Sequence, residues 1–179
     1  MTCIAGLVHK GNVYIGGDSA GVAGQQIIAR KDEKVFKNGE FIIGFTSSFR
    51  MGQLLRYKFT PPEIKEGQDL FEYMVKDFVE EVRICFKTGG YTSMINTNNE
   101  RGGTFLIGVR GRLFEIDCDF QVGENLCGFA SVGCGESYAL GALDVNTKLK
   151  PKDRIIQALE TASKFSTGVC APFMVLSNE

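Results

Sequence analysis

The chain contains very little histidine, with His9 as its only copy in 179 residues. Hydrolases that activate a serine or cysteine with histidine need both groups in a defined arrangement. Gly17-Asp18-Ser19-Ala20-Gly21 matches the G-x-S-x-G turn of the α/β-hydrolases. That turn follows a built sheet and precedes its histidine, whereas two expected strands precede Ser19 and His9 lies upstream. We therefore exclude a Ser-His-Asp triad and expect His9 to be exposed at a strand end.

Cysteine pairs of the metal-binding kind are also missing. The six cysteines form no C-x-x-C pair, and a single histidine does not complete a zinc site. We expect no metal ion, no cofactor and no disulfide framework, but reduced and mostly buried thiols in a cytoplasmic protein. The cysteines are Cys3, Cys85, Cys118, Cys127, Cys134 and Cys170.

The sequence has neither an excess of one charge nor a long apolar run. Twenty basic and 21 acidic residues give a net charge of −1, so a nucleic-acid partner is not expected. No apolar run approaches the roughly 20 residues of a membrane span, and the N-terminus lacks a signal-peptide pattern. With 44% hydrophobic residues, the chain is expected to form one globular domain over 1–179.

Short apolar segments joined by turn residues occupy the first 47 positions. Lys10-Gly11-Asn12 and Asn38-Gly39 are typical of hairpin turns. The sequence therefore opens as sheet, before any helix. The expected strands cover 2–9, 13–18, 27–31, 33–37 and 40–47.

Two helices are expected next, at 48–58 and 68–87. Pro61-Pro62 ends the first helix. The second has an apolar residue at every fourth position and further apolar residues that widen the buried stripe. The repeating positions are Leu70, Met74, Phe78, Val82 and Phe86, and the widening ones are Phe71, Val75 and Val79.

A polar stretch at 88–103, rich in Gly, Asn and Thr, is expected to be a long surface loop. The remaining sequence predicts strands at 104–109, 112–117 and 128–133, helices at 135–145 and 152–164, and a last strand at 172–176. Pro151 suits the first turn of its helix, where a missing N–H costs nothing. This order of elements predicts a mixed α+β fold in which helices cover largely antiparallel sheets.

Thr2 is the strongest candidate for a catalytic nucleophile in the chain. Removal of Met1 would place a hydroxyl and a free α-amine on one residue, and such an amine titrates near pH ~7.7–8.0. Thr2 would then carry its own general base and would need no histidine. Cys3 is a weaker candidate, because neighbouring side chains of a strand point to opposite faces.

Thr2, Asp18 and Lys34 are spaced as in the β-type subunits of the proteasome and the bacterial peptidase HslV, members of the N-terminal nucleophile hydrolases. The segment 2–24 resembles the first hairpin of that family, and 44–48 resembles its substrate loop. Residues 131–136 resemble its G-S-G segment. The resemblance implies a single proteasome-like domain, built as a four-layer αββα sandwich of two antiparallel sheets covered by helices.

The resemblance also implies roles for individual residues. Thr2 would be the nucleophile, and Lys34, held by Asp18, would supply a positive charge beside it. A backbone N–H of Ser47 or Ser48 would stabilise the oxyanion. An extended peptide would pair with edges near Val22 and Ser48. The residues placed by position in the substrate pocket are Val22, Phe36, Thr46 and Arg50.

Three positions depart from the family pattern. Cys134 stands where the family has a serine beside the threonine, and a thiol is a poorer hydrogen-bond partner. Lys164 stands where an aspartate usually precedes the turn that here contains Thr167. A serine replaces the glycine of the oxyanion loop, so the backbone at that serine must keep a negative φ.

Three functions remain open. The first is a threonine peptidase that acts after loss of Met1 on peptides or unfolded proteins. It would form a homo-oligomeric ring or stacked rings, fed by an ATP-dependent unfoldase. The second is a catalytically inactive proteasome-fold subunit for assembly, and the third is an amidase for a small amide. Site residues, and not the fold, decide between them.

Overall fold

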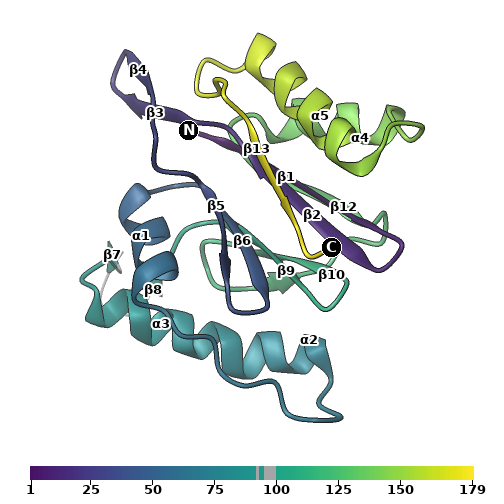
Figure 1. Ribbon diagram of the computed structural model, residues 1–179. Coiled ribbons are helices and arrows are strands. Elements are labelled where there is room, and N and C mark those ends of the chain that lie inside the picture. The colour runs from purple at the N-terminus through teal and green to yellow at the C-terminus, as the bar shows by residue number, and fades with distance from the viewer. Residues whose placement is uncertain (92, 95–99) are drawn as a thin grey trace.

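The chain folds into two antiparallel sheets that face each other, with helices on both outer sides (Figure 1). The computed structural model describes residues 1–91, 93–94 and 100–179. The first sheet has the order β12-β1-β2-β13 and the second has the order β11-β10-β9-β6-β5. The strands of the first sheet are β1 (Cys3–His9), β2 (Asn12–Gly17), β12 (Phe129–Gly133) and β13 (Met174–Ser177). Those of the second are β5 (Val35–Asn38), β6 (Phe41–Phe45), β9 (Phe105–Val109), β10 (Arg112–Ile116) and β11 (Val122–Gly123).

Three buried clusters hold four layers together. One lies between the sheets and includes Ile4, Ile15, Ile42 and Leu106. The second joins the outer face of the first sheet to α4 (Glu136–Val145) and α5 (Pro151–Phe165). The third joins the second sheet to α1 (Phe49–Tyr57), α2 (Leu70–Tyr73) and α3 (Val79–Thr88). The predicted αββα arrangement of antiparallel sheets and covering helices is confirmed.

The hairpin turns form largely where turn residues predict them. Lys10 and Gly11 both have positive φ between β1 and β2, as Arg110 and Gly111 do between β9 and β10. The turn expected at Asn38-Gly39 lies one residue later, because Asn38 still pairs with Phe41 at the end of the β5–β6 ladder. The side-chain amide of Asn38 donates to the carbonyl groups of Leu55 and Phe59.

The expected strand at 27–31 is replaced by a two-stranded ladder, β3 (Ala20–Ala23) and β4 (Gln26–Ala29). It carries the exposed side chains of Ile27 and Ile28. The strand β3 is not apparent from the sequence, because Gly21 and Ala23 weaken the apolar alternation there.

The helix expected at 68–87 runs through residues 70–88, but a π-helical turn, Met74–Phe78, interrupts it. Residues four apart drift around a regular α-helix, whereas the wider π turn keeps Met74, Phe78, Val82 and Phe86 on the buried face. The predicted widening of the stripe is wrong at Phe71 and Val75, which are 37% and 45% exposed.

The surface loop expected at 88–103 falls partly outside the described residues. Within it, β7 (Ser93–Met94) pairs with β8 (Glu100–Arg101). The other late elements that the sequence predicts begin and end within two residues of their predicted bounds, and Pro151 starts α5 as expected. The short strand β11 was not predicted. In the part of the chain that the structure describes, no helix is long and apolar enough to cross a membrane.

Candidate active site

Thr2, Asp18 and Lys34 meet at one end of the first sheet. Lys34 Nζ donates to Thr2 Oγ1 over 2.9 Å and to Asp18 Oδ1 over 2.8 Å. Thr2 directly precedes β1, Asp18 directly follows β2, and the β1–β2 register pairs Ile4 with Gly17. The first hairpin therefore returns the chain to the nucleophile, and Lys34 reaches it from the start of β5 in the opposite sheet.

Backbone amides fix the carboxylate of Asp18. Its Oδ1 accepts from the N–H of Cys3 over 3.0 Å, and its Oδ2 accepts from Ala20 over 2.8 Å and from Cys170 over 3.3 Å. With Lys34, four donors from separate parts of the chain surround one carboxylate. Such a carboxylate cannot turn away, so it holds the ammonium group against Thr2.

The ion pair is buried. Thr2, Asp18 and Lys34 are 4%, 2% and 3% exposed. Burial lowers the pKa of Lys34, while the Asp18 carboxylate opposes that shift. The buried ammonium acts more strongly on a neighbouring hydroxyl than it would in water, and Asp18 holds it in place.

Cys134 and Ser166 lie on the other side of Thr2. The Thr2 N–H donates to Cys134 Sγ over 3.3 Å, and the Ser166 hydroxyl donates to the same sulfur over 3.1 Å. Here the Thr2 nitrogen is a peptide amide, which stands in for the α-amine that removal of Met1 would create. Cys134 thus contacts the group that would serve as general base.

The other two supporting positions do not join this network. Lys164 lies in the last turn of α5, and both Lys164 and Thr167 are exposed. Ser166, the residue before Thr167, makes the contact instead. The sequence predicts the turn after α5, but only the hydrogen bond to Cys134 identifies Ser166 as the hydroxyl that enters the site. Gly168 in the same turn packs against Cys134 and Met1.

Met1 covers the nucleophile. Met1 is 56% exposed, whereas Thr2 beneath it is buried. The Thr2 hydroxyl donates a short hydrogen bond to the Met1 carbonyl oxygen. Substrate cannot reach Thr2 Oγ1 while this residue is in place. Removal of Met1 would both free the amine and open the site.

The expected oxyanion loop lies beside Thr2, between β6 and α1. Ser47 has a positive φ of 63°, and the N–H of Ser48 donates to Thr46 O over 2.7 Å, which forms a γ-turn. Ser48 has a φ of −142°, so its backbone meets the requirement set by the replaced glycine. Its N–H is already used by Thr46, however, and must turn to receive an oxyanion.

The expected pocket residues separate into different surroundings. Thr46 lies near Thr2, but Phe36 is 2% exposed and belongs to the core beneath α1. Arg50 is exposed and donates to the carbonyl of Gly89 over 3.2 Å. Val22 is half-buried on β3. Phe49, which the sequence analysis did not select, places its ring 5.7 Å from Lys34 Nζ.

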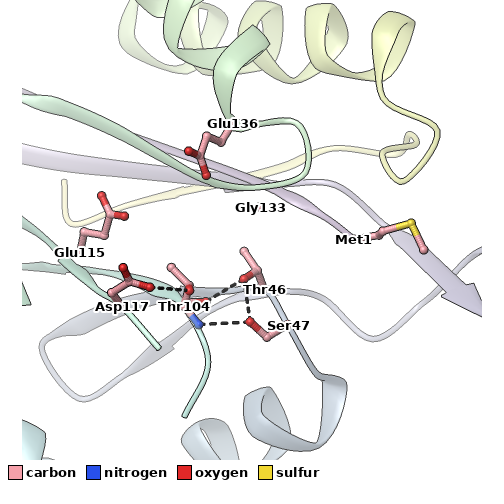
Figure 2. Close-up of a pocket in the computed structure, with 8 residues that line it drawn as sticks. All are labelled: Met1, Thr46, Ser47, Thr104, Glu115, Asp117, Gly133 and Glu136. Atoms are coloured by element: carbon pink, nitrogen blue, oxygen red, sulfur yellow. Dashed lines mark hydrogen bonds between the residues drawn. The ribbon is translucent and has the colours of Figure 1, made fainter. Parts of the chain in front are cut away.

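A cavity of about 390 Å³ adjoins the site. Figure 2 shows Thr46, Ser47 and Thr104 on one side of it, with Glu136 opposite and Met1 at the edge. Glu115 and Asp117 complete its wall. Part of the loop beside Thr2 therefore also lines an acidic space.

Two residues weighed as alternative catalytic groups lie elsewhere. Cys3 points away from the Thr2 side chain into the cluster beneath α4 and α5, and burial raises the pKa of its thiol to about 12. His9 is exposed at the far end of β1, as expected. Ser19 donates its hydroxyl proton to Pro172 O.

No protein-family model and no curated protein matches the sequence. Solved structures do match over nearly the whole chain. Thiobacillus denitrificans BPH has a TM-score of 0.80 at 19% identity, over 99% of this chain and 98% of its own. Eukaryotic HslV from Trypanosoma brucei has a TM-score of 0.68 at 16% identity, over 98% of both chains.

A third structure is Anbu, an ancestral beta-subunit, from Yersinia bercovieri. Its TM-score is 0.65 at 16% identity, over 98% of this chain and 81% of its own. At such identities the likeness concerns the fold and not the reaction. This chain therefore has the αββα fold of BPH, HslV and Anbu, the fold that the resemblance implied.

Proposed function

We propose that the protein is a threonine peptidase in which Thr2 is the nucleophile once Met1 has been removed. The observation that carries this proposal is the hydrogen-bonded series of Asp18, Lys34 and Thr2, buried at the end of β1. The arrangement supplies a hydroxyl, a fixed positive charge and, after loss of Met1, a base on one residue. No histidine or metal ion is needed for this chemistry.

The reaction would proceed in two stages. The free α-amine of Thr2 takes the hydroxyl proton while Oγ1 attacks the substrate carbonyl, and the Lys34 charge stabilises the developing alkoxide. The amine then gives its proton to the leaving nitrogen, so that an acyl ester remains on Oγ1. Water activated by the same amine hydrolyses this ester and restores Thr2. Ser48 is our candidate for the oxyanion donor.

Cys134 and Ser166 would position the amine. The Cys134 sulfur already lies 3.3 Å from the Thr2 nitrogen, and the Ser166 hydroxyl holds that sulfur. This pair would take the place of the supporting serine and aspartate that the resemblance implies.

We further propose a homo-oligomer, a ring or stacked rings, that acts in the reducing cytoplasm on peptides or unfolded proteins. An ATP-dependent unfoldase would deliver folded substrates. Proteins with the same fold include HslV and an ancestral beta-subunit, and all six cysteines of the chain are free thiols. Size-exclusion chromatography with light scattering tests the assembly, and a stable monomer would contradict it.

The decisive experiment measures Met1 removal and Thr2 reactivity on the same sample. Intact-mass spectrometry should find the purified protein lacking Met1. Epoxomicin, which is seen in complex with Thiobacillus denitrificans BPH, should then add stoichiometrically and lose its site in Thr2→Ala. Retained Met1 together with no labelling would support the alternative of an inactive assembly subunit.

That alternative has observations in its favour. Met1 seals Thr2, and Thr46 occupies the Ser48 N–H. An amidase for small amides is the second alternative. Hydrolysis of acyl amides without hydrolysis of peptides longer than four residues would favour it.

A further inference from the structure

The cavity beside the candidate nucleophile is acidic on several sides. Glu115 comes from β10, Asp117 directly follows that strand, and Glu136 begins α4 (Figure 2). These side chains reach the cavity from both sheet-and-helix halves of the molecule. Among the described residues that line it there is no lysine or arginine.

Two of these carboxylates accept no hydrogen bond from a described residue. Asp117 accepts hydrogen bonds from the Cys118 N–H, from Thr104 and from Gln121. Glu115 and Glu136 have no such partner among the described residues. Burial, followed by the charges of Glu136 and Asp117, raises the pKa of Glu115. A cationic group placed here would relieve both the burial cost and the repulsion.

The position of the cavity relative to Thr2 indicates which part of a substrate would enter it. In amide cleavage, the base that takes the nucleophile's proton returns it to the leaving nitrogen. For Thr2 that base is its own α-amine, so the leaving half of a bound peptide must extend past the Thr2 nitrogen. Met1 is bonded to this nitrogen and forms part of the cavity lining. The space next to the Thr2 nitrogen is therefore continuous with the acidic cavity.

Met1 also shows that this space accepts a peptide residue. It is bonded to the Thr2 nitrogen, and its carbonyl oxygen accepts a hydrogen bond from the Thr2 hydroxyl. Gly133 lines the same cavity. Removal of Met1 would enlarge the space by one residue.

We infer that Glu115 and Glu136 form a binding site for a lysine or arginine side chain within the first two residues after the scissile bond. This inference rests on the proposed peptidase function and adds a substrate class to it. Charge-assisted hydrogen bonds to two otherwise unpaired carboxylates would hold the cation, while Thr46 and Ser47 would flank the peptide backbone. The site thereby selects the leaving half of a substrate independently of the acyl half.

The test uses internally quenched peptides that share one acyl half and carry Lys, Gln or Glu at the first two positions after the cut. The purified oligomer lacking Met1 should show kcat/KM values at least about tenfold higher for Lys than for Glu. In the double variant Glu115→Gln/Glu136→Gln, this ratio should fall to about one. Glu160→Gln, which changes an exposed acid on α5, is the matched control and should keep the ratio.

An acyl-aminocoumarin, which has no residue after the bond, separates failure of this inference from failure of the function. If the coumarin and the peptides are cleaved without preference for Lys, the inference is wrong and the peptidase function stands. If nothing is cleaved, fluorescence anisotropy of the same peptides on Thr2→Ala protein lacking Met1 measures binding alone. Equal affinity for Lys and Glu peptides there would overturn the acidic site.

Discussion

Gly133 packs directly against the carbonyl group of Thr2. A β-carbon at Gly133 would lie 2.3 Å from Thr2 O, and the φ of Gly133 is +103°, a value that residues with side chains rarely adopt. Gly133 is also the register partner of Cys3 in the β1–β12 ladder. This close approach places the nucleophile relative to Cys134, so the position requires glycine for two independent reasons.

Gly133→Ala should therefore abolish Thr2 reactivity with epoxomicin and lower the free energy of unfolding by about 1–3 kcal/mol. Gly128→Ala is the matched control, because Gly128 also has positive φ but has open space around it. It should cost stability and leave reactivity intact. Equal reactivity in both variants would show that the contact with Thr2 is unimportant.

Replacement of Lys34 should affect both stability and chemistry. Lys34→Met leaves the Asp18 carboxylate buried without its cation, and the loss of one partner from such a pair costs about 3–5 kcal/mol. Chemical denaturation measures that loss, and epoxomicin labelling should disappear. Lys37→Met removes an exposed lysine from β5, the strand that follows Lys34, and should change neither property. Labelling that persists in Lys34→Met would remove Lys34 from the mechanism.

The two cysteines beside Thr2 should differ in reactivity toward iodoacetamide. At pH 8, Cys3, with a pKa of about 12, is a thiolate in roughly one molecule in 10,000, and it is also fully buried. Cys134 is exposed. Peptide mapping should find Cys134 carboxamidomethylated and Cys3 intact, and the modified protein should no longer bind epoxomicin. Cys134→Ser should stay active after the same treatment.

Ser166 and Thr167 provide a test of which hydroxyl supports the amine. Ser166→Ala removes the donor to Cys134 Sγ and should lower kcat by about three- to tenfold with little change in KM. Thr167→Ala changes an exposed side chain and should have no effect. The reverse order of effects would restore the position expected from sequence.

The pH dependence of kcat/KM should be bell-shaped. Activity should rise as the Thr2 α-amine loses its proton, below its ordinary pKa of ~7.7–8.0 because the nearby Lys34 charge disfavours a second cation. It should fall when Lys34 itself is deprotonated. Burial lowers the Lys34 pKa, so this descending limb lies below the ordinary lysine value. A plateau that extends past that value would show that the Lys34 charge is not used.

Local signals account for most of the predicted fold. Glycine at positive φ marks the β1–β2 and β9–β10 turns, and Ser48 caps α1 with its hydroxyl accepting from the Arg50 N–H. Pro151 begins α5. Each of these features depends on a few neighbouring residues, so it can be read from a short segment. The π turn at 74–78 could not, because four-residue spacing is also compatible with a regular helix whose buried face drifts.

The candidate site divides in the same way. Spacing and resemblance identified Thr2, Asp18 and Lys34, and their meeting follows from hairpins that return the chain to its starting edge. Ser166 was not selected, because its contact with Cys134 depends on how the turn after α5 packs against the end of β12. Phe36 was placed in a pocket by position alone, whereas packing beneath α1 buries it.

The sequence by itself determined most of the order of elements, the main antiparallel hairpins and the three residues of the central hydrogen-bonded series. Backbone preference and side-chain alternation act over a few residues, so these properties can be predicted from short segments of the sequence. Only the tertiary structure decided that Met1 seals Thr2, that Cys134 lies on its nitrogen and that three carboxylates share one cavity beside it. The contact between Cys134 and Thr2 joins residues 132 positions apart, and all of these relationships depend on the register and packing of two sheets.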